Sequence, residues 1–290
     1  FLHFLSSYVL LFRDIFLENF FYTAYLQEFE KICSEYPLHQ LVYTDGSKTA
    51  NGVGSAVVTE GIAHQWSLDP KSSATFAEQY AMLQAMLYCY MSDTRMFLIV
   101  TDCNNVLNGI SQIYPSDPMN IKCQSALNVV RDQGKSIKFV WVPSHVGIPG
   151  NEQADQAAYQ ATFNEQIDVE FVVASDITKY LKERYTMEWQ EKWARINTHL
   201  SQIKPAVKDL FTLQHPSREE NVKMHRLRIG HTKITHQHLL KGRPPRYCNH
   251  CNIALTVMHI INDCPLYAVE RVRHNIMPNY VTNFNSQNAN

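Results

Sequence analysis

Apolar residues in the middle of the chain follow two periodicities, one typical of strands and one typical of helices. The run LVYTDGSK is apolar and β-branched, which predicts a strand with an acid, Asp45, at its carboxyl end. Two more strands are predicted at 54–59 and 62–68, joined by a tight turn at Glu60-Gly61. These three strands are expected to form an antiparallel meander.

Helical spacing then replaces the strand pattern. In TFAEQYAMLQAMLYCYM the apolar residues recur every three or four positions, which predicts a helix capped by Ser72 or Ser73. MFLIVTD is a continuous apolar run, as expected of a strand covered on both faces, and it ends at Asp102. A short helix from Asn104, a helix at 119–133, the strand SIKFVWV and a helix at 151–162 complete the pattern.

This order of elements predicts an α/β fold with a five-stranded mixed sheet and helices on both faces. Crossovers through helices make the first, fourth and fifth strands parallel. In such sheets ligands bind beyond the carboxyl ends of the strands, where Asp45 and Asp102 both lie.

The flanking regions carry weaker patterns. The opening FLHFLSSYVLLF is broken by Arg13 and Asp14, short of the roughly 18 apolar residues that a membrane span needs, so we expect an amphipathic or buried helix and no membrane partner. The first residue is Phe1 rather than Met, which is compatible with a fragment of a longer polypeptide. Residues 165–222 are expected to be mainly helical, with Trp189 and Trp193 in a core.

Composition narrows the class of protein. A hydrophobic fraction of 45% and a charged fraction of 18% are typical of a globular chain and exclude wholesale disorder. Seven cysteines without regular pairing favour a reducing, intracellular compartment, nucleus or cytoplasm. The net charge is −3 for residues 1–37, −3 for 38–164 and +5 for 165–290. The acidic middle region therefore needs metal ions or the basic region to approach a polyanion.

Four acids are candidates for a metal site. Asp45 and Asp102 end neighbouring strands, Glu78 lies on a helix rich in small residues, and Asp155 lies in the first turns of the last helix. Two Mg²⁺ ions can cleave a phosphodiester, and carboxylates suit Mg²⁺ or Mn²⁺. Taken singly, Asp45 or Asp102 is equally well explained as an ordinary strand-end acid.

The motifs around these acids resemble those of a known family. Thr44-Asp45-Gly46-Ser47, Phe76-Ala77-Glu78, Thr101-Asp102 and WVPSHVGIPGNEQADQAA are similar to the motif set of type 1 ribonuclease H, especially the domain that follows the reverse transcriptase of non-LTR retrotransposons. The resemblance implies two Mg²⁺ ions held by Asp45, Glu78, Asp102 and Asp155. It also implies that His145 assists proton transfer or product release. Cys103 stands where the family usually has serine, and the basic handle helix of some bacterial members is not apparent.

The same resemblance implies an RNA/DNA hybrid as the partner. Hybrids present a wide, shallow minor groove with exposed 2′-hydroxyls. Gly46, Ser47 and Asn51 are candidates for that contact, although a simple hairpin approach explains them equally well.

The C-terminal third holds a basic segment. Residues 223–246 contain no acid and seven basic residues, which favours a nucleic-acid contact over a merely solvated face: Lys223, Arg226, Arg228, Lys233, Lys241, Arg243 and Arg246.

A group of cysteines and histidines follows the basic segment. Its spacing, Cys248-x2-Cys251-x7-His259-x4-Cys264, is able to close a tetrahedral Zn²⁺ site, with His250 as a competing ligand. The alternative is that these are reduced structural cysteines near a core histidine. The cluster resembles the one that trails many non-LTR retroelement polyproteins, although a standard zinc knuckle has four residues where this chain has seven.

These features predict five regions: an N-terminal helical segment or upstream remnant at 1–37, a ribonuclease H domain at 38–164, a helical linker at 165–222, the basic segment with its Cys/His cluster at 223–268, and a tail at 269–290. The leading hypothesis is a hybrid-specific endonuclease that belongs to or derives from a retroelement protein with an upstream reverse transcriptase. A decayed or domesticated nucleic-acid-binding module is the alternative. An integrase or transposase of the same fold would lack the SHVGIPGNEQAD loop and helix.

Overall fold

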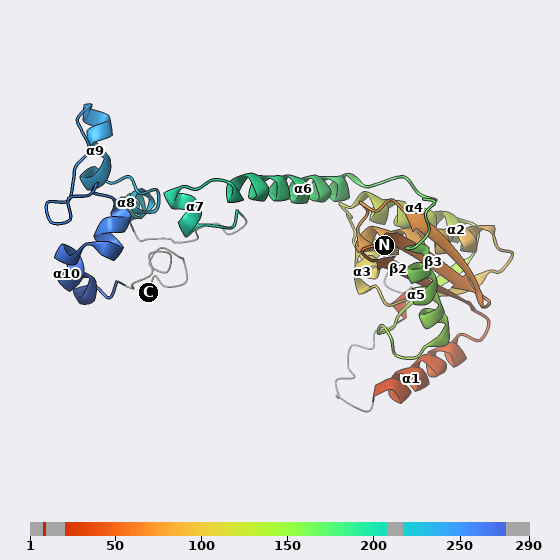
Figure 1. Ribbon diagram of the computed structural model, residues 1–290. Helices are drawn as coiled ribbons and strands as arrows, with labels where there is room; N and C mark the ends of the chain where they lie inside the picture. Colours follow the sequence, from red (N-terminus) through yellow and green to blue (C-terminus); the bar gives the residue numbers. More distant parts are fainter. Residues whose placement is uncertain (1–7, 10–20, 208–216, 277–290) are drawn as a thin grey trace. The chain divides into compact units, whose positions relative to one another are not determined.

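The computed structural model describes residues 8–9, 21–207 and 217–276 (Figure 1). The chain divides into two compact units, Phe1–Tyr180 and Leu181–Asn290. The helix expected at 1–12 lies outside the described residues except at Tyr8–Val9, where the expectation is wrong because these residues form a short strand. Among the described residues, no helix is both long enough and apolar enough to cross a membrane.

A mixed sheet forms the centre of the first unit. Its strands within the described residues are β1 (Tyr8–Val9), β2 (Gln40–Lys48), β3 (Val53–Thr59), β4 (Ile62–Leu68), β5 (Met96–Thr101) and β6 (Ser136–Trp141), in the order β1-β6-β5-β2-β3-β4. Strands β2, β3 and β4 pair antiparallel, while β2, β5 and β6 run parallel. The five predicted strands and the predicted meander are thus confirmed. The short edge strand β1 was not predicted.

Helices cover both faces of this sheet. Side chains of a strand alternate between its faces, so Phe97 and Ile99 pack in the core beneath α2 (Ala74–Met91), α3 (Asn104–Ser111) and α4 (Pro118–Asp132). Leu98 and Val100 face the opposite side and pack with α1 (Phe21–Glu35). Helix α5 (Pro149–Ala161) lies over β2, β3 and β4, where Ala157 and Ala158 meet β3.

Local capping agrees with the sequence. Ser73, one of the two predicted caps, accepts a hydrogen bond from the Phe76 backbone N–H at 3.1 Å at the start of α2. The Glu60-Gly61 turn has positive φ angles of 51° and 75°, as a tight hairpin requires.

The first unit extends past residue 164. The Asp168 carboxylate accepts a hydrogen bond from the Ser67 backbone N–H at 2.8 Å, and the Asp176 carboxylate accepts one from the Ser73 backbone N–H at 2.7 Å. Because Val173 is also buried in this core, the chain after α5 is an integral part of the unit.

The second unit consists of short helices around a small core. It contains α7 (His199–Ile203), α8 (Arg218–Arg228), α9 (Lys233–Lys241), a π-helix (His259–Asp263), a 3-10 turn (Pro265–Tyr267) and α10 (Ala268–Arg273). Helix α6 (Ala174–Ala194) leads into it. The expectation that both tryptophans of α6 are in a core is wrong for Trp189, which is 60% exposed because most of this helix faces solvent.

Candidate active site and metal-binding residues

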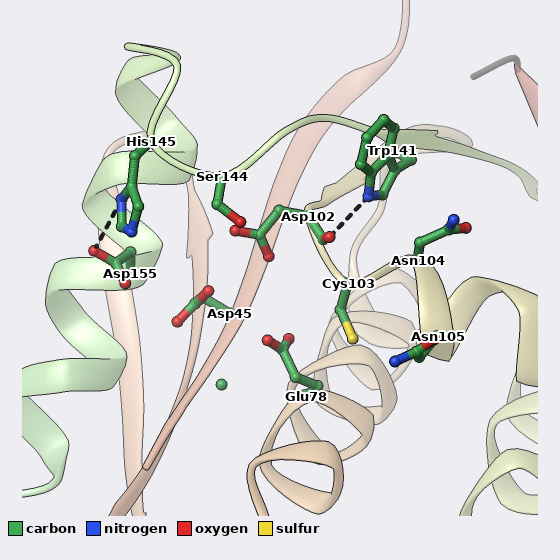
Figure 2. A pocket seen from close by; sticks show the side chains of 11 residues that line it. Asp45, Glu78, Asp102, Cys103, Asn104, Asn105, Trp141, Ser144, His145 and Asp155 are labelled. Carbon is green, nitrogen blue, oxygen red and sulfur yellow. Dashed lines mark hydrogen bonds and ion pairs between the residues drawn. The ribbon is translucent and has the colours of Figure 1, made fainter. Parts of the chain in front are cut away.

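Four acids predicted from the sequence come from four different elements. Asp45 lies near the carboxyl end of β2 and Asp102 directly follows β5. Glu78 lies in the second turn of α2, and Asp155 lies in α5. All four residues line one depression, and Figure 2 shows the Asp155 carboxylate beside His145 rather than among those of Asp45, Glu78 and Asp102.

Close packing between α2 and β2 brings two of these acids together. A side chain at Gly46 would collide with the backbone of Ala77 and Glu78, so only glycine allows α2 to approach β2 this closely. As a result, carboxylate oxygens of Asp45, Glu78 and Asp102 lie within 4.8 Å of one another. Such a group of hard oxygen donors suits a divalent cation such as Mg²⁺.

The carboxylates carry uncompensated negative charge. Burial, followed by the charges of Asp102 and Asp155, raises the pKa of Asp45 to about 7. Burial and the charge of Asp45 likewise raise the pKa of Glu78 well above its ordinary value. The Oε2 atom of Glu78 is buried and has no hydrogen-bond partner. A buried oxygen without a partner among like charges is what a cation site requires, so the residues present fit a divalent metal.

The loop before α5 carries the predicted histidine. His145 Nδ1 lies 3.9 Å from Asp155 Oδ2 and 3.7 Å from Glu152 Oε2. A dashed line in Figure 2 marks the contact with Asp155. Its φ angle is 56°, a left-handed conformation that is uncommon for a residue other than glycine. Glu152 also accepts a hydrogen bond from the Gly147 backbone N–H at 3.1 Å. Sequence reasoning did not single out Glu152, although its place in the first turn of α5 was visible.

The depression has a volume of about 460 Å³ and a mostly polar lining. Besides the acids and His145, its lining includes residues that the sequence did not mark as functional: Asn104, Asn105, Trp141 and Ser144. The Trp141 indole N–H donates a 2.7 Å hydrogen bond to the backbone oxygen of Asp102 and so fixes the start of the loop after β5. Burial raises the pKa of the Cys103 thiol to about 11, which keeps it neutral beside the carboxylates.

Part of the first unit matches a known protein family. Residues 38–163 match the model of the RNase H family. The chain therefore carries a ribonuclease H domain.

Proteins similar to this domain include segments of viral polyproteins and bacterial ribonucleases H that match over most of their length. The Pol polyprotein of equine infectious anemia virus (strain Wyoming) is 33% identical over 124 residues, which are 40% of this chain and 10% of the polyprotein. The chain thus spans about a tenth of the length of such relatives. Ribonuclease H of Pseudomonas paraeruginosa is 29% identical over 137 residues, 41% of this chain and 89% of that protein. The solved structure of ribonuclease H1 from Halobacterium salinarum aligns with a TM-score of 0.34 at 18% identity, covering 42% of this chain and 96% of that chain.

The three residues considered for contact with a hybrid lie around the β2–β3 turn. Gly46 lines the depression, and its packing against α2 is itself a structural reason for glycine. Ser47 is partly exposed and Asn51 is exposed.

The basic segment is mostly at the surface. Six of its seven predicted contact residues are exposed: Lys223, Arg226, Lys233, Lys241, Arg243 and Arg246. Lys223 forms a 2.8 Å ion pair with Glu219, which reduces its availability. Arg228 departs from the expectation, because it is 2% exposed and its guanidinium lies inside the second unit.

The predicted cysteine and histidine ligands converge. The Cys248 and Cys264 sulfurs are 3.6 Å apart, the Cys251 and Cys264 sulfurs are 3.9 Å apart, and the four ligand atoms including one from His259 lie within 4.8 Å of one another. A tight turn closed by a 2.8 Å hydrogen bond from the Asn252 backbone N–H to the Cys248 oxygen presents the first two cysteines. His250, the competing ligand, is exposed and outside this group.

Proposed function

We propose that the ribonuclease H domain hydrolyses the RNA strand of RNA/DNA hybrids with two divalent cations. The observation that carries this proposal is the convergence of Asp45, Glu78 and Asp102 within 4.8 Å at the edge of the sheet, with the pKa of Asp45 raised to about 7. Carboxylates held this close are costly unless a cation neutralises them.

Asp45, Glu78, Asp102 and Asp155 would hold Mg²⁺ or Mn²⁺. Bound there, the ions would activate a water molecule and stabilise the charge on the leaving oxygen. The remaining tasks belong to side chains of the protein. Asp155 is partly exposed and next to His145, so it links the buried carboxylates to the exposed side of the site. His145, whose side chain is 68% exposed, is placed to exchange protons with solvent and with the product.

Recognition of the hybrid is proposed to involve Gly46, Ser47 and Asn51. They follow Asp45 along the end of β2 and into the β2–β3 turn, where Gly46 lines the depression, Ser47 is partly exposed and Asn51 is exposed. Exposed backbone and small polar groups at such a place can contact 2′-hydroxyls in a shallow minor groove.

We further infer that Cys248, Cys251, His259 and Cys264 bind Zn²⁺. Four ligands at Zn–S distances of about 2.3 Å in a tetrahedron place sulfur atoms about 3.8 Å apart, close to the 3.6 and 3.9 Å in this chain. His259 is 3% exposed, and its ring nitrogens have no hydrogen-bond partner outside the cluster. All seven cysteines lie in the described part of the chain and form no disulfide, as a reducing nuclear or cytoplasmic environment would maintain them.

The basic segment at 223–246 is proposed as a second nucleic-acid contact. Residues 38–164 have a net charge of −3, whereas residues 165–290 have +5. Exposed Arg226, Lys241 and Arg243 can supply attraction to phosphates that the acidic domain lacks.

The matches to viral Pol polyproteins support an origin in a retroelement protein with an upstream reverse transcriptase. The competing function is a nucleic-acid-binding module that no longer cuts. Four acids that line one depression favour catalysis, because a binding module has no need of repelling buried carboxylates.

Incubation of the chain with end-labelled RNA/DNA hybrid, duplex RNA and duplex DNA, with Mg²⁺ or with EDTA, tests the proposal. We expect cuts in the RNA strand of the hybrid alone and only with Mg²⁺. Retained hybrid without any cleavage in Mg²⁺ or Mn²⁺ would establish the binding module instead.

A further inference from the structure

Helix α1 lies upstream of the region that matches the RNase H family, yet it is packed into the same unit. The match begins at residue 38, whereas α1 spans Phe21–Glu35. Phe29 and Ile32 are 6% and 7% exposed and form one core cluster with Leu98 and Val100 of β5. Helix α1 therefore covers a sheet face that would otherwise be exposed apolar surface.

The same helix reaches the loop that carries His145. A Cβ atom built at Gly147 would lie 3.6 Å from Leu26 Cδ1, so the Leu26 side chain lies next to Gly147 in the loop. Val146 and Leu26 both pack against the cluster that contains α1, and Ile148 within it is fully buried. The inner side of the loop thus rests on α1.

The outer side of the loop is held by Glu152. Its carboxylate accepts the 3.1 Å hydrogen bond from the Gly147 backbone N–H and lies 3.7 Å from His145 Nδ1. Between these two supports, His145 has a φ angle of 56° and Gly147 one of 79°. Positive φ at a residue other than glycine persists only where the surroundings impose it.

We propose that α1 is a positioning element of the nuclease site, and that Leu26 acts as a positioning residue by holding the loop so that His145 faces Asp155. The inference rests on the proposed function, since it concerns how His145 is presented for turnover. It predicts that the working catalytic unit includes α1 and does not begin at residue 38. The four acids lie on β2, on α2, after β5 and on α5, so the proposal concerns the loop and not the metal ligands themselves.

The test uses the full chain with Leu26→Ala, and with Ile32→Ala as the matched control. Ile32 packs on the same cluster but lies six residues, about 9 Å, further along the helix. Leu26→Ala is expected to lower kcat on a hybrid about 3- to 10-fold with KM unchanged, because small misplacement of a catalytic group slows turnover. Ile32→Ala is expected to lower thermal stability but not kcat. An equal loss of kcat in both variants would overturn the proposal.

A double-mutant cycle with His145→Ala separates positioning from general stability. If Leu26 acts through His145, then Leu26→Ala lowers kcat in the parent chain and has no further effect in the His145→Ala chain. Equal fold-losses in both backgrounds would show that Leu26 does not act through His145. Should Leu26→Ala fail to fold, Leu26→Val serves in the same cycle.

Hydrogen exchange at the backbone amides of Val146 and Gly147 gives a readout that needs no activity. Faster exchange in Leu26→Ala, with unchanged exchange in Ile32→Ala, is expected. Unchanged exchange in Leu26→Ala would overturn the proposal. A chain that cleaves no hybrid refutes the proposed function, and the exchange result still decides whether α1 holds the loop.

Discussion

The two candidate metal sites of this chain differ in their ligand atoms and in how far apart the ligands lie in the sequence. Asp45, Glu78 and Asp102 are spread over 58 residues and come from three elements, whereas the Cys/His cluster lies within the 17 residues from Cys248 to Cys264. The carboxylates lie near the carboxyl ends of central strands, in a sheet that has a large hydrophobic core on each face. The core cluster beside the Cys/His group contains two buried residues, Ile203 and Val257.

This difference distinguishes a catalytic metal site from a structural one. The sheet assembles the carboxylates and tolerates their repulsion, so an ion can enter and leave a site that already exists. Around the Cys/His cluster the apolar core is too small to order the chain alone, and metal-binding energy would be folding energy there. The first site is expected to lose activity without its ion, and the second to lose structure.

The largest expected effect comes from the carboxylate site. Asp102→Asn removes one charge from the metal ligands, which costs several kcal/mol of transition-state stabilisation and lowers hybrid cleavage about a thousandfold or more. Because the change is nearly isosteric, the midpoint temperature of thermal unfolding is expected to stay the same or to rise slightly. Asp132→Asn, at an exposed position of α4, is the matched control with parent activity. Full cleavage by Asp102→Asn in Mg²⁺ would refute the site.

In the second unit, Cys251→Ser is expected to abolish stoichiometric zinc binding and to unfold the region around the cluster. Zinc content by elemental analysis and the dispersion of amide resonances for residues 247–264 measure both effects. Cys33→Ser, a half-buried thiol of α1 outside the cluster, is expected to keep one zinc per chain. If both variants bind equal zinc, the cluster is not the zinc site.

A smaller effect is expected in the salt dependence of hybrid binding. Replacing Arg226, Lys241 and Arg243 together by alanine should flatten the slope of log affinity against log salt by about 0.9 per lost phosphate contact, so by about 2 to 3. The matched triple variant of exposed lysines on α6 changes Lys179, Lys182 and Lys192. Equal slopes for the two triple variants would mean that the basic segment is only solvated surface.

The smallest effect concerns stability without metal. Because the pKa of Asp45 is raised to about 7, the folded state binds a proton that the unfolded state has released above about pH 4. In EDTA the free energy of unfolding of the first unit should therefore fall, on the order of 1 to 3 kcal/mol, as pH rises from about 4 to 8. Asp45→Asn or saturating Mg²⁺ should reduce that fall, while exposed Asp93→Asn should not. Denaturant titrations at pH 5 and pH 8 measure it, and a rise in stability would contradict the assignment.

Much of the fold was predictable because hydrophobic periodicity is a local property. The strand that ends before Asp102, the serine cap of α2 and the order of the crossovers follow from runs of a few residues and from the handedness of connections. The strand predicted to end at Asp45 continues to Lys48, because its pairing with β3 extends through Gly46, Ser47 and Lys48. The Cys/His cluster was predictable for the same reason, since its turn and short helix place ligands that are near in sequence near in space.

The remaining features depend on contacts between distant segments, for which the sequence has no local pattern. Strand β1 pairs with β6 across more than a hundred residues, and α1 covers β5 and reaches Gly147. Arg228 was expected at the surface with its basic neighbours, but the packing of the second unit buries it. Trp189 was expected in a core, but α6 leaves it exposed.

By itself the sequence determined which residues form strands, cap helices and carry metal-binding atoms, because these properties are decided by backbone preference and side-chain chemistry within a few positions. Only the tertiary structure decided how closely those atoms approach. The contact of Gly46 with α2 brings Glu78 to Asp45, and the shared burial of these carboxylates raises their pKa. Likewise, the supports of the His145 loop, Leu26 and Glu152, lie on two helices more than a hundred residues apart, and packing alone brings them to the same turn of the chain.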